Sequence, residues 1–174
     1  QRCFDSMALR PILHHPDPRL RIKAKPVTVF DDALQAFIED LFETMYDAAG
    51  VGLAATQVGV DLRVAVMDCS GDREHPEPLV LINPEISEPG DRQVMDEGCL
   101  SVPGFSEKVT RFNRLHLRAL DRHGQPFELN AEGLMAQAIQ HEIDHLDGKL
   151  YLDLLSSLKR ERLLKKLQKQ EKRA

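Results

Sequence analysis

The stretch QHEIDH at residues 140–145 decides what the rest of this chain is built around. It lies in an amphipathic run, residues 131–146, which predicts a helix. Residues four apart share one face of a helix, so His141 and His145 can direct their imidazoles at one point, with Glu142 beside them. The pattern H-E-x-x-H is typical of two metal ligands and a general base that takes a proton from water on the metal. The alternative is a surface helix with two chance histidines.

We predict a third ligand at Cys99, in the segment DEGCLSVPG at residues 96–104. Glycine and proline in this segment are atypical of a buried strand and indicate a special turn or a strand end. The chain has three cysteines without close pairing, which argues against a disulfide framework and leaves room for a functional thiolate. A lone free cysteine is usually a small buried apolar residue. Here, however, a helix with two histidines still needs a third ligand.

Two imidazoles and one thiolate leave the fourth tetrahedral position open for water, as in catalytic sites. The ion would lower the pKa of that water and polarise a carbonyl, while Glu142 takes the proton and passes it to the leaving amine. Ferrous iron, nickel, cobalt and zinc are all compatible with this donor set. An oxyanion would also need hydrogen-bond donors, and the candidates are the Gln57 side chain and the Leu100 backbone N–H.

The run GVGLAATQVG at residues 50–59 indicates a wall where a ligand lies against bare backbone. A phosphate-binding loop is a weak alternative, because the Lys-Ser/Thr ending and the G-x-G-x-x-G spacing are both absent. Glu97 is close to Cys99 in sequence. It is either a surface carboxylate or the partner of a cation such as Arg111.

The order of the expected elements predicts an α+β fold. In this fold antiparallel β-sheets pack around the central metal-binding helix, with an N-terminal core helix and a C-terminal helix. Apolar residues at helical spacing after Asp31 predict the N-terminal helix, which ends near residue 49. Strand patterns occur at residues 63–68, 79–84, 114–120 and 126–130, and the last helix spans about residues 156–172.

The chain of 174 residues, 42% hydrophobic, fits one domain, which we place at residues 7–174. Residues 1–6, ahead of Met7, are expected to be an added N-terminal extension. No apolar run approaches the ~18 residues of a membrane span, so we expect a soluble cytoplasmic protein, and a monomer. The net charge is −5, but residues 159–174 carry eight basic residues against two acidic ones. An acidic body with a basic tail is not typical of a DNA-binding domain, although the tail could be a docking surface.

Three separated segments, residues 50–57, 97–101 and 140–145, together resemble bacterial peptide deformylases. The similarity runs from about Met7 to the C-terminus, and no motif position departs from the pattern. The resemblance implies a hydrolase that removes the formyl group from the N-formyl-methionine of nascent bacterial chains and releases formate, with Fe(II) as the usual metal. It implies these roles: Cys99, His141 and His145 as ligands, Glu142 as acid and base, Gln57 and the Leu100 N–H as oxyanion donors, and Glu97 paired with Arg111.

The resemblance also implies that the nascent peptide lies extended as an added strand along Val51, Gly52 and Gly98. Helical spacing places Leu134 and Ala138 on the ligand face, where they can line the pocket for the methionine side chain. Gln137 shares that face, an amide where an aliphatic residue would be expected. The basic C-terminal helix resembles that of a subgroup in which this helix is linked to docking at the ribosomal exit.

Two other functions stay open at this point. A zinc endopeptidase would need a further His or Glu ligand downstream of the helix, where Asp147 and Asp153 are the nearby acids. A metal-stabilised binding module without enzymatic activity would leave Glu142 and Gln57 without a role, and would usually supply a fourth protein ligand.

Overall fold

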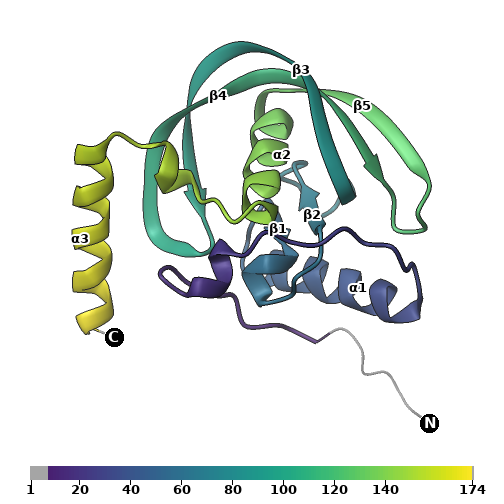
Figure 1. Cartoon of the computed structure of the whole chain (residues 1–174), viewed down its shortest axis with the longest axis horizontal. Helices are drawn as coiled ribbons and strands as arrows, with labels where there is room; N and C mark the ends of the chain where they lie inside the picture. The colour runs from purple at the N-terminus through teal and green to yellow at the C-terminus, as the bar shows by residue number, and fades with distance from the viewer. Residues whose placement is uncertain (1–7, 174) are drawn as a thin grey trace.

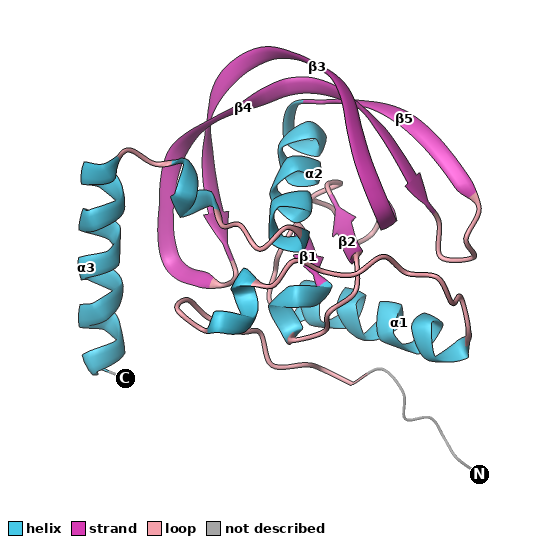
Figure 2. Cartoon of the chain, viewed as in Figure 1, coloured by secondary structure: helices cyan, strands magenta, loops and turns pink. Residues whose placement is uncertain are grey.

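The computed structural model describes residues 8–173 of the chain, and its fold is of the α+β class (Figures 1 and 2). The expected extension at residues 1–6 lies outside the described residues. The α-helices are α1 (Asp32–Asp47), α2 (Gly133–Leu146) and α3 (Ser157–Arg173), and the 3-10 helices are η1 (Pro18–Arg21), η2 (Ala55–Val58) and η3 (Tyr151–Leu154). The strands are β1 (Gly52–Ala54), β2 (Val64–Asp68), β3 (Pro78–Cys99), β4 (Val102–Leu120) and β5 (Pro126–Glu132).

The strands form one antiparallel sheet in the order β1-β2-β3-β4-β5. The long strands β3 and β4 arch over α2, as Figure 1 shows. Shifts of register between Ile82 and Glu85 and between Ser87 and Gly90 interrupt their pairing, and such irregularities bend a strand. The metal-binding helix therefore lies within the curve of one bent sheet, where the sequence predicted separate sheets on either side.

Strands β3 and β4 are much longer than the sequence patterns at residues 79–84 and 114–120 predicted. The added length of β3 is mainly polar and largely exposed, and it contains Pro89 and Gly90, which weaken any strand prediction; the added length of β4 is partly buried, at Val102 and Val109. They are strands because they pair with each other over a long register, from Gly90 opposite Arg114 to Gly98 opposite Ser106. Pairing between the two strands therefore stabilises the extended conformation where the local sequence has no apolar alternation.

Helix α1 begins and ends close to the predicted positions. The Asp31 side chain accepts a hydrogen bond of 3.0 Å from the Leu34 backbone N–H, which caps the first turn. Its apolar face packs on β1 and β2 in a buried cluster that includes Ile38, Leu41 and Met45. This cluster supports the segment that leads from α1 into β1, and so positions one wall of the site.

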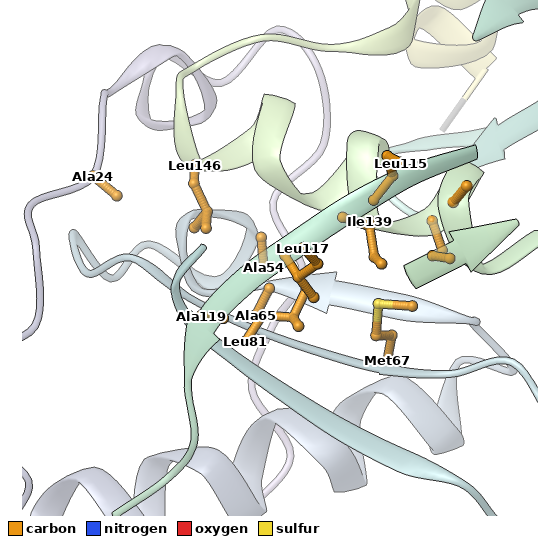
Figure 3. Packing of buried hydrophobic residues seen from close by; sticks show 13 residues of the cluster. Ala24, Ala54, Ala65, Met67, Leu81, Leu115, Leu117, Ala119, Ile139 and Leu146 are labelled. Atoms are coloured by element: carbon orange, nitrogen blue, oxygen red, sulfur yellow. The ribbon is translucent and has the colours of Figure 1, made fainter. Parts of the chain in front are cut away.

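Helix α2 is covered by apolar side chains from several strands. Figure 3 shows Ile139 and Leu146 of α2 in one cluster with Leu115 and Leu117 of β4. The helix begins at Gly133, slightly later than the predicted amphipathic run, because residues 131 and 132 still pair with β4 as the end of β5. The buried helix gives the side chains on its open face a rigid base.

Helix α3 lies beside the start of β4 at the edge of the molecule (Figure 1). Leu163 and Leu167 are buried there in a cluster with Val102, Val109 and Tyr151. The remaining surface of α3 is mainly charged and exposed. The helix therefore packs its apolar face on the sheet and exposes its charged face to solvent. Within residues 8–173, no helix combines the length and apolar character that crossing a membrane requires.

Candidate metal centre

Three predicted ligands converge at one point, although β3 and α2 are far apart in sequence. The Nε2 atom of His145 lies 3.2 Å from Sγ of Cys99 and 3.1 Å from Nε2 of His141. The three ligand atoms all lie within 4.8 Å of one another. A thiolate and two imidazoles at this spacing match the donors that a divalent transition metal takes in a tetrahedral site. The prediction of a Cys-His-His metal site is confirmed.

The ring of His141 is held from behind by Glu97. Its Nδ1 atom lies 2.7 Å from Oε2 of Glu97, so the Nδ1 proton is donated to the carboxylate and Nε2 keeps its lone pair for a metal. Arg111 donates to both oxygens of the same carboxylate, at 3.0 Å and 2.6 Å, which is the ion pair expected from the resemblance. Burial opposes the negative charge of Glu97, but the hydrogen bonds from His141 and Arg111 outweigh it and bring its pKa to about 2.

Arg111 also binds a second carboxylate on α2. Its Nη1 atom lies 2.7 Å from Oδ2 of Asp144, which ties β4 to the metal-binding helix from the other side. This contact was not predicted from the sequence. Asp144 lies within the QHEIDH motif, so it could have been considered as a site residue. Its partner Arg111 could not be identified without the register of the strands.

His145 is fully enclosed by protein. Burial lowers its pKa well below the usual value, because the charged imidazolium loses its hydration. The neutral ring is the form in which histidine binds a metal. Thr56 of η2 donates a hydrogen bond of 3.1 Å to the His145 backbone carbonyl, so the small-residue segment also holds the last turn of α2.

Glu142 is buried next to the ligand histidines. Burial raises its pKa to about 7, because the carboxylate loses its hydration. Its Oε1 atom has no hydrogen-bond partner among the described residues, so it is free to accept a proton from a bound molecule. Gly52 makes room for it, since a Cβ at that position would stand 2.9 Å from Cδ of Glu142. The bare backbone predicted for this wall is required by the carboxylate behind it.

The side chain of Gln57 is fixed at both ends. Its Oε1 atom accepts a hydrogen bond of 2.9 Å from the Ala54 N–H, and its Nε2 atom donates to Oγ of Ser101 at 3.0 Å. The same amide nitrogen lies 3.7 Å from Sγ of Cys99, so its N–H groups face the metal site. Ser101, whose own N–H donates to Sγ of Cys99 at 3.4 Å, was not assigned from the sequence, although it lies in the segment that provides Cys99.

A cavity of about 430 Å³ opens beside the ligands Cys99 and His141. Its wall includes Glu142, Gln57 and Leu100 together with all of the predicted substrate-binding residues: Val51, Gly52, Gly98, Leu134 and Ala138. Gln137 lines the same cavity. The structure therefore brings these predicted residues together in the wall of one cavity.

The two acids considered as endopeptidase ligands are engaged elsewhere. Asp147 forms an ion pair of 3.0 Å with Arg63, and Asp153 forms one of 2.6 Å with Arg21. Neither belongs to the group of side chains that could hold a metal within the described part of the chain. The geometry therefore disfavours a zinc endopeptidase that uses a third acidic ligand downstream of α2.

A family model described as "Polypeptide deformylase" matches residues 9–161. The chain is 57% identical over 162 residues to a peptide deformylase of Hahella chejuensis, covering 92% of this chain and 95% of that relative. It is 58% identical over 168 residues to a peptide deformylase of Pseudomonas aeruginosa, covering 95% and 98%.

Solved structures of peptide deformylases also resemble this fold. The crystal structure of a peptide deformylase from Legionella pneumophila matches with a TM-score of 0.90 and 52% sequence identity, over 95% of this chain and 96% of that chain. A peptide deformylase from Synechococcus elongatus in complex with actinonin matches with a TM-score of 0.86 and 41% identity, over 90% and 86% of the two chains.

Proposed function

The chain belongs to the polypeptide deformylase family, and from that premise we propose how its own residues remove the N-formyl group from nascent peptides. Cys99, His141 and His145 hold one divalent ion, and Glu142 transfers the protons of the reaction. The observation that carries this proposal is the buried carboxylate of Glu142 beside three converging ligand atoms, with one carboxylate oxygen left without a partner.

An ion held by these three ligands would supply a water of lowered pKa and would polarise the formyl carbonyl. Glu142 accepts the proton of the attacking water and then donates it to the amine of the departing peptide. The Gln57 amide and the Leu100 N–H donate hydrogen bonds to the carbonyl oxygen as it gains negative charge. Glu97 keeps the His141 ring in one orientation throughout, since it holds the Nδ1 proton.

The formyl-methionyl peptide lies extended in the groove and pairs with the backbone of Val51, Gly52 and Gly98. Strand β1 is at the edge of the sheet, so it has a free side for such a pairing. The methionine side chain enters the apolar part of the cavity beside Leu134 and Ala138. Methionine suits this irregular space because its side chain is unbranched and flexible.

The test is the release of formate from formyl-Met-Ala-Ser, measured together with the metal content of the protein. We expect release by the wild type and its loss in Glu142→Ala, by about 100- to 10,000-fold, with the metal retained. An active Glu142→Ala protein would contradict the proposed acid–base role. A wild-type protein that binds a metal without releasing formate would favour the binding-module alternative.

We further propose that the physiological metal is Fe(II), with zinc, nickel or cobalt able to replace it, since a donor set of one thiolate and two imidazoles accepts all four ions. Metal quantification after anaerobic purification tests this proposal. Iron at about one ion per chain is expected. Anaerobic protein that is fully active with zinc and contains no iron would contradict it.

We also propose that the monomeric enzyme docks at the ribosomal exit through α3, in the cytoplasm where formylated chains arise. Lysines on the exposed face of α3 support this proposal, because they carry positive charge toward a polyanionic surface. Replacement of Lys165 and Lys166 by glutamate should reduce cosedimentation with ribosomes and leave the hydrolysis of a free tripeptide unchanged. Equal cosedimentation of the variant and the wild type would contradict docking through this face.

A further inference from the structure

Gln137 makes two hydrogen bonds that its place in the cavity wall does not require. Its Nε2 atom donates to the backbone carbonyl of Asp96 at 2.8 Å and to Oε1 of Glu97 at 3.2 Å. Both acceptors belong to the end of β3, two and three residues before Cys99, whereas Gln137 belongs to α2. One amide group therefore connects the two elements that supply the three ligand atoms.

The Glu97 carboxylate is held through both of its oxygen atoms. Oε1 accepts from Nε of Arg111 and from Gln137, while Oε2 accepts from Nη2 of Arg111 and from Nδ1 of His141. Gln137 and His141 stand four residues apart on one face of α2, so the helix grips the carboxylate at two points, one on each oxygen. Rotation of the carboxylate would break its hydrogen bonds to Gln137 and to His141, both on α2.

From this arrangement we propose that Gln137 is a positioning residue of the metal centre. By fixing Glu97, it sets the direction of the His141 ring, and by binding the Asp96 carbonyl, it fixes the strand end that presents Cys99. Loss of the amide leaves the ligands present but less well oriented for a common ion. This inference rests on the proposed metal site and concerns a residue outside the three ligands.

A role limited to the cavity wall makes a different prediction. Gln137 lines the same groove as Leu134 and Ala138, so a substitution there can change how the methionine side chain fits. Such a change would alter KM and leave the binding of an ion in the absence of substrate unaffected. Metal affinity therefore separates positioning from packing.

The experiment compares wild type, Gln137→Met and Gln93→Met after removal of metal with a chelator. Methionine has a length similar to glutamine but donates no hydrogen bond. Gln93 is the matched control because it is a glutamine on β3, the strand that Gln137 contacts, and because its side chain is exposed and makes no hydrogen bond to any described residue. Co(II) is the probe, since the absorption of a cobalt–thiolate bond reports the Cys99 ligand directly, and competition with a chelator gives the affinity.

We expect Gln137→Met to bind Co(II) about tenfold more weakly than wild type, with an altered cobalt–thiolate band, while Gln93→Met matches wild type. In the cobalt-loaded enzymes kcat should fall more than KM rises. Gln137→Met with the affinity and spectrum of wild type would overturn the inference, whether or not its KM changes. Wild-type protein that binds no Co(II) would instead refute the proposed metal site itself, so the two failures are distinguishable.

Discussion

Removal of the Arg111 guanidinium should destabilise the protein strongly, even with no metal bound. The side chains of Arg111 and Glu97 are only 5% and 4% exposed, and Arg111 also pairs with Asp144. Arg111→Met would leave the Glu97 carboxylate buried without its cation. Breaking a buried ion pair by removing one partner costs about 3–5 kcal/mol, a large part of the ~5–15 kcal/mol that stabilises a typical domain.

Lys108→Met is the matched control for this change, because Lys108 lies on the same strand and pairs with Asp96 at 3.1 Å. That pair is exposed on both sides, with side-chain exposures of 66% and 76%. Exposed ion pairs contribute about 0–1 kcal/mol, so the control should unfold nearly as the wild type does.

The free energy of unfolding should be measured by urea denaturation of chelator-treated proteins, so that loss of metal affinity does not add to the result. The double variant Glu97→Met/Arg111→Met should be more stable than Arg111→Met alone, because no unpaired charge stays buried beside β4. An Arg111→Met protein that loses no more stability than Lys108→Met would show that the cation of Arg111 is not needed to keep Glu97 buried.

Three further predictions follow from the same structure. Gly52→Ala should reduce kcat/KM by about 100-fold or more while metal content stays the same, because the new Cβ displaces the Glu142 carboxylate; activity equal to wild type would contradict the contact. Gln57→Leu should lower kcat for formate release by about 100- to 1,000-fold through loss of an oxyanion donor, and a change confined to KM would exclude that role. Burial alone would raise the pKa of Asp68, but hydrogen bonds from Ser70 and Tyr46 lower it from 3.8 to about 2. The ionised form of Asp68 therefore stabilises the fold above pH 3.8, and this contribution is lost as the pH falls toward 2. Urea titrations at pH 5 and at about pH 2.5 should show a smaller loss of stability in Asp68→Asn than in wild type, and equal losses would contradict the shift.

The chemistry of the metal centre could be predicted from the sequence because it depends on residues that are close together in the chain. The spacing of His141 and His145 fixes a shared helix face in any α-helix, and Glu142 must lie beside them. The segment around Cys99 was recognised as a strand end because glycine and proline do not suit a buried strand. These inferences needed no knowledge of the sheet.

What the sequence did not predict depends on contacts between distant elements. The outer halves of β3 and β4 carry no apolar alternation, and they are strands through their mutual pairing. The contacts of Arg111 with Asp144 and of Gln137 with Glu97 depend on the register of that pairing and on the position of α2 beneath it. Helical periodicity predicted the face of α2 on which Gln137 lies, but it could not predict that Asp96 and Glu97 of β3 lie next to that face.

The proposed function requires one ion, held by Cys99, His141 and His145, and the carboxylate of Glu142 beside it. The most direct test is to titrate chelator-treated protein with Co(II) while formate release from formyl-Met-Ala-Ser is measured. The proposed function predicts that release rises in proportion to bound ion and stops rising at about one ion per chain, and that Glu142→Gln binds the same amount of ion without release. Formate release by the chelator-treated protein, or by Glu142→Gln at the wild-type rate, would contradict it.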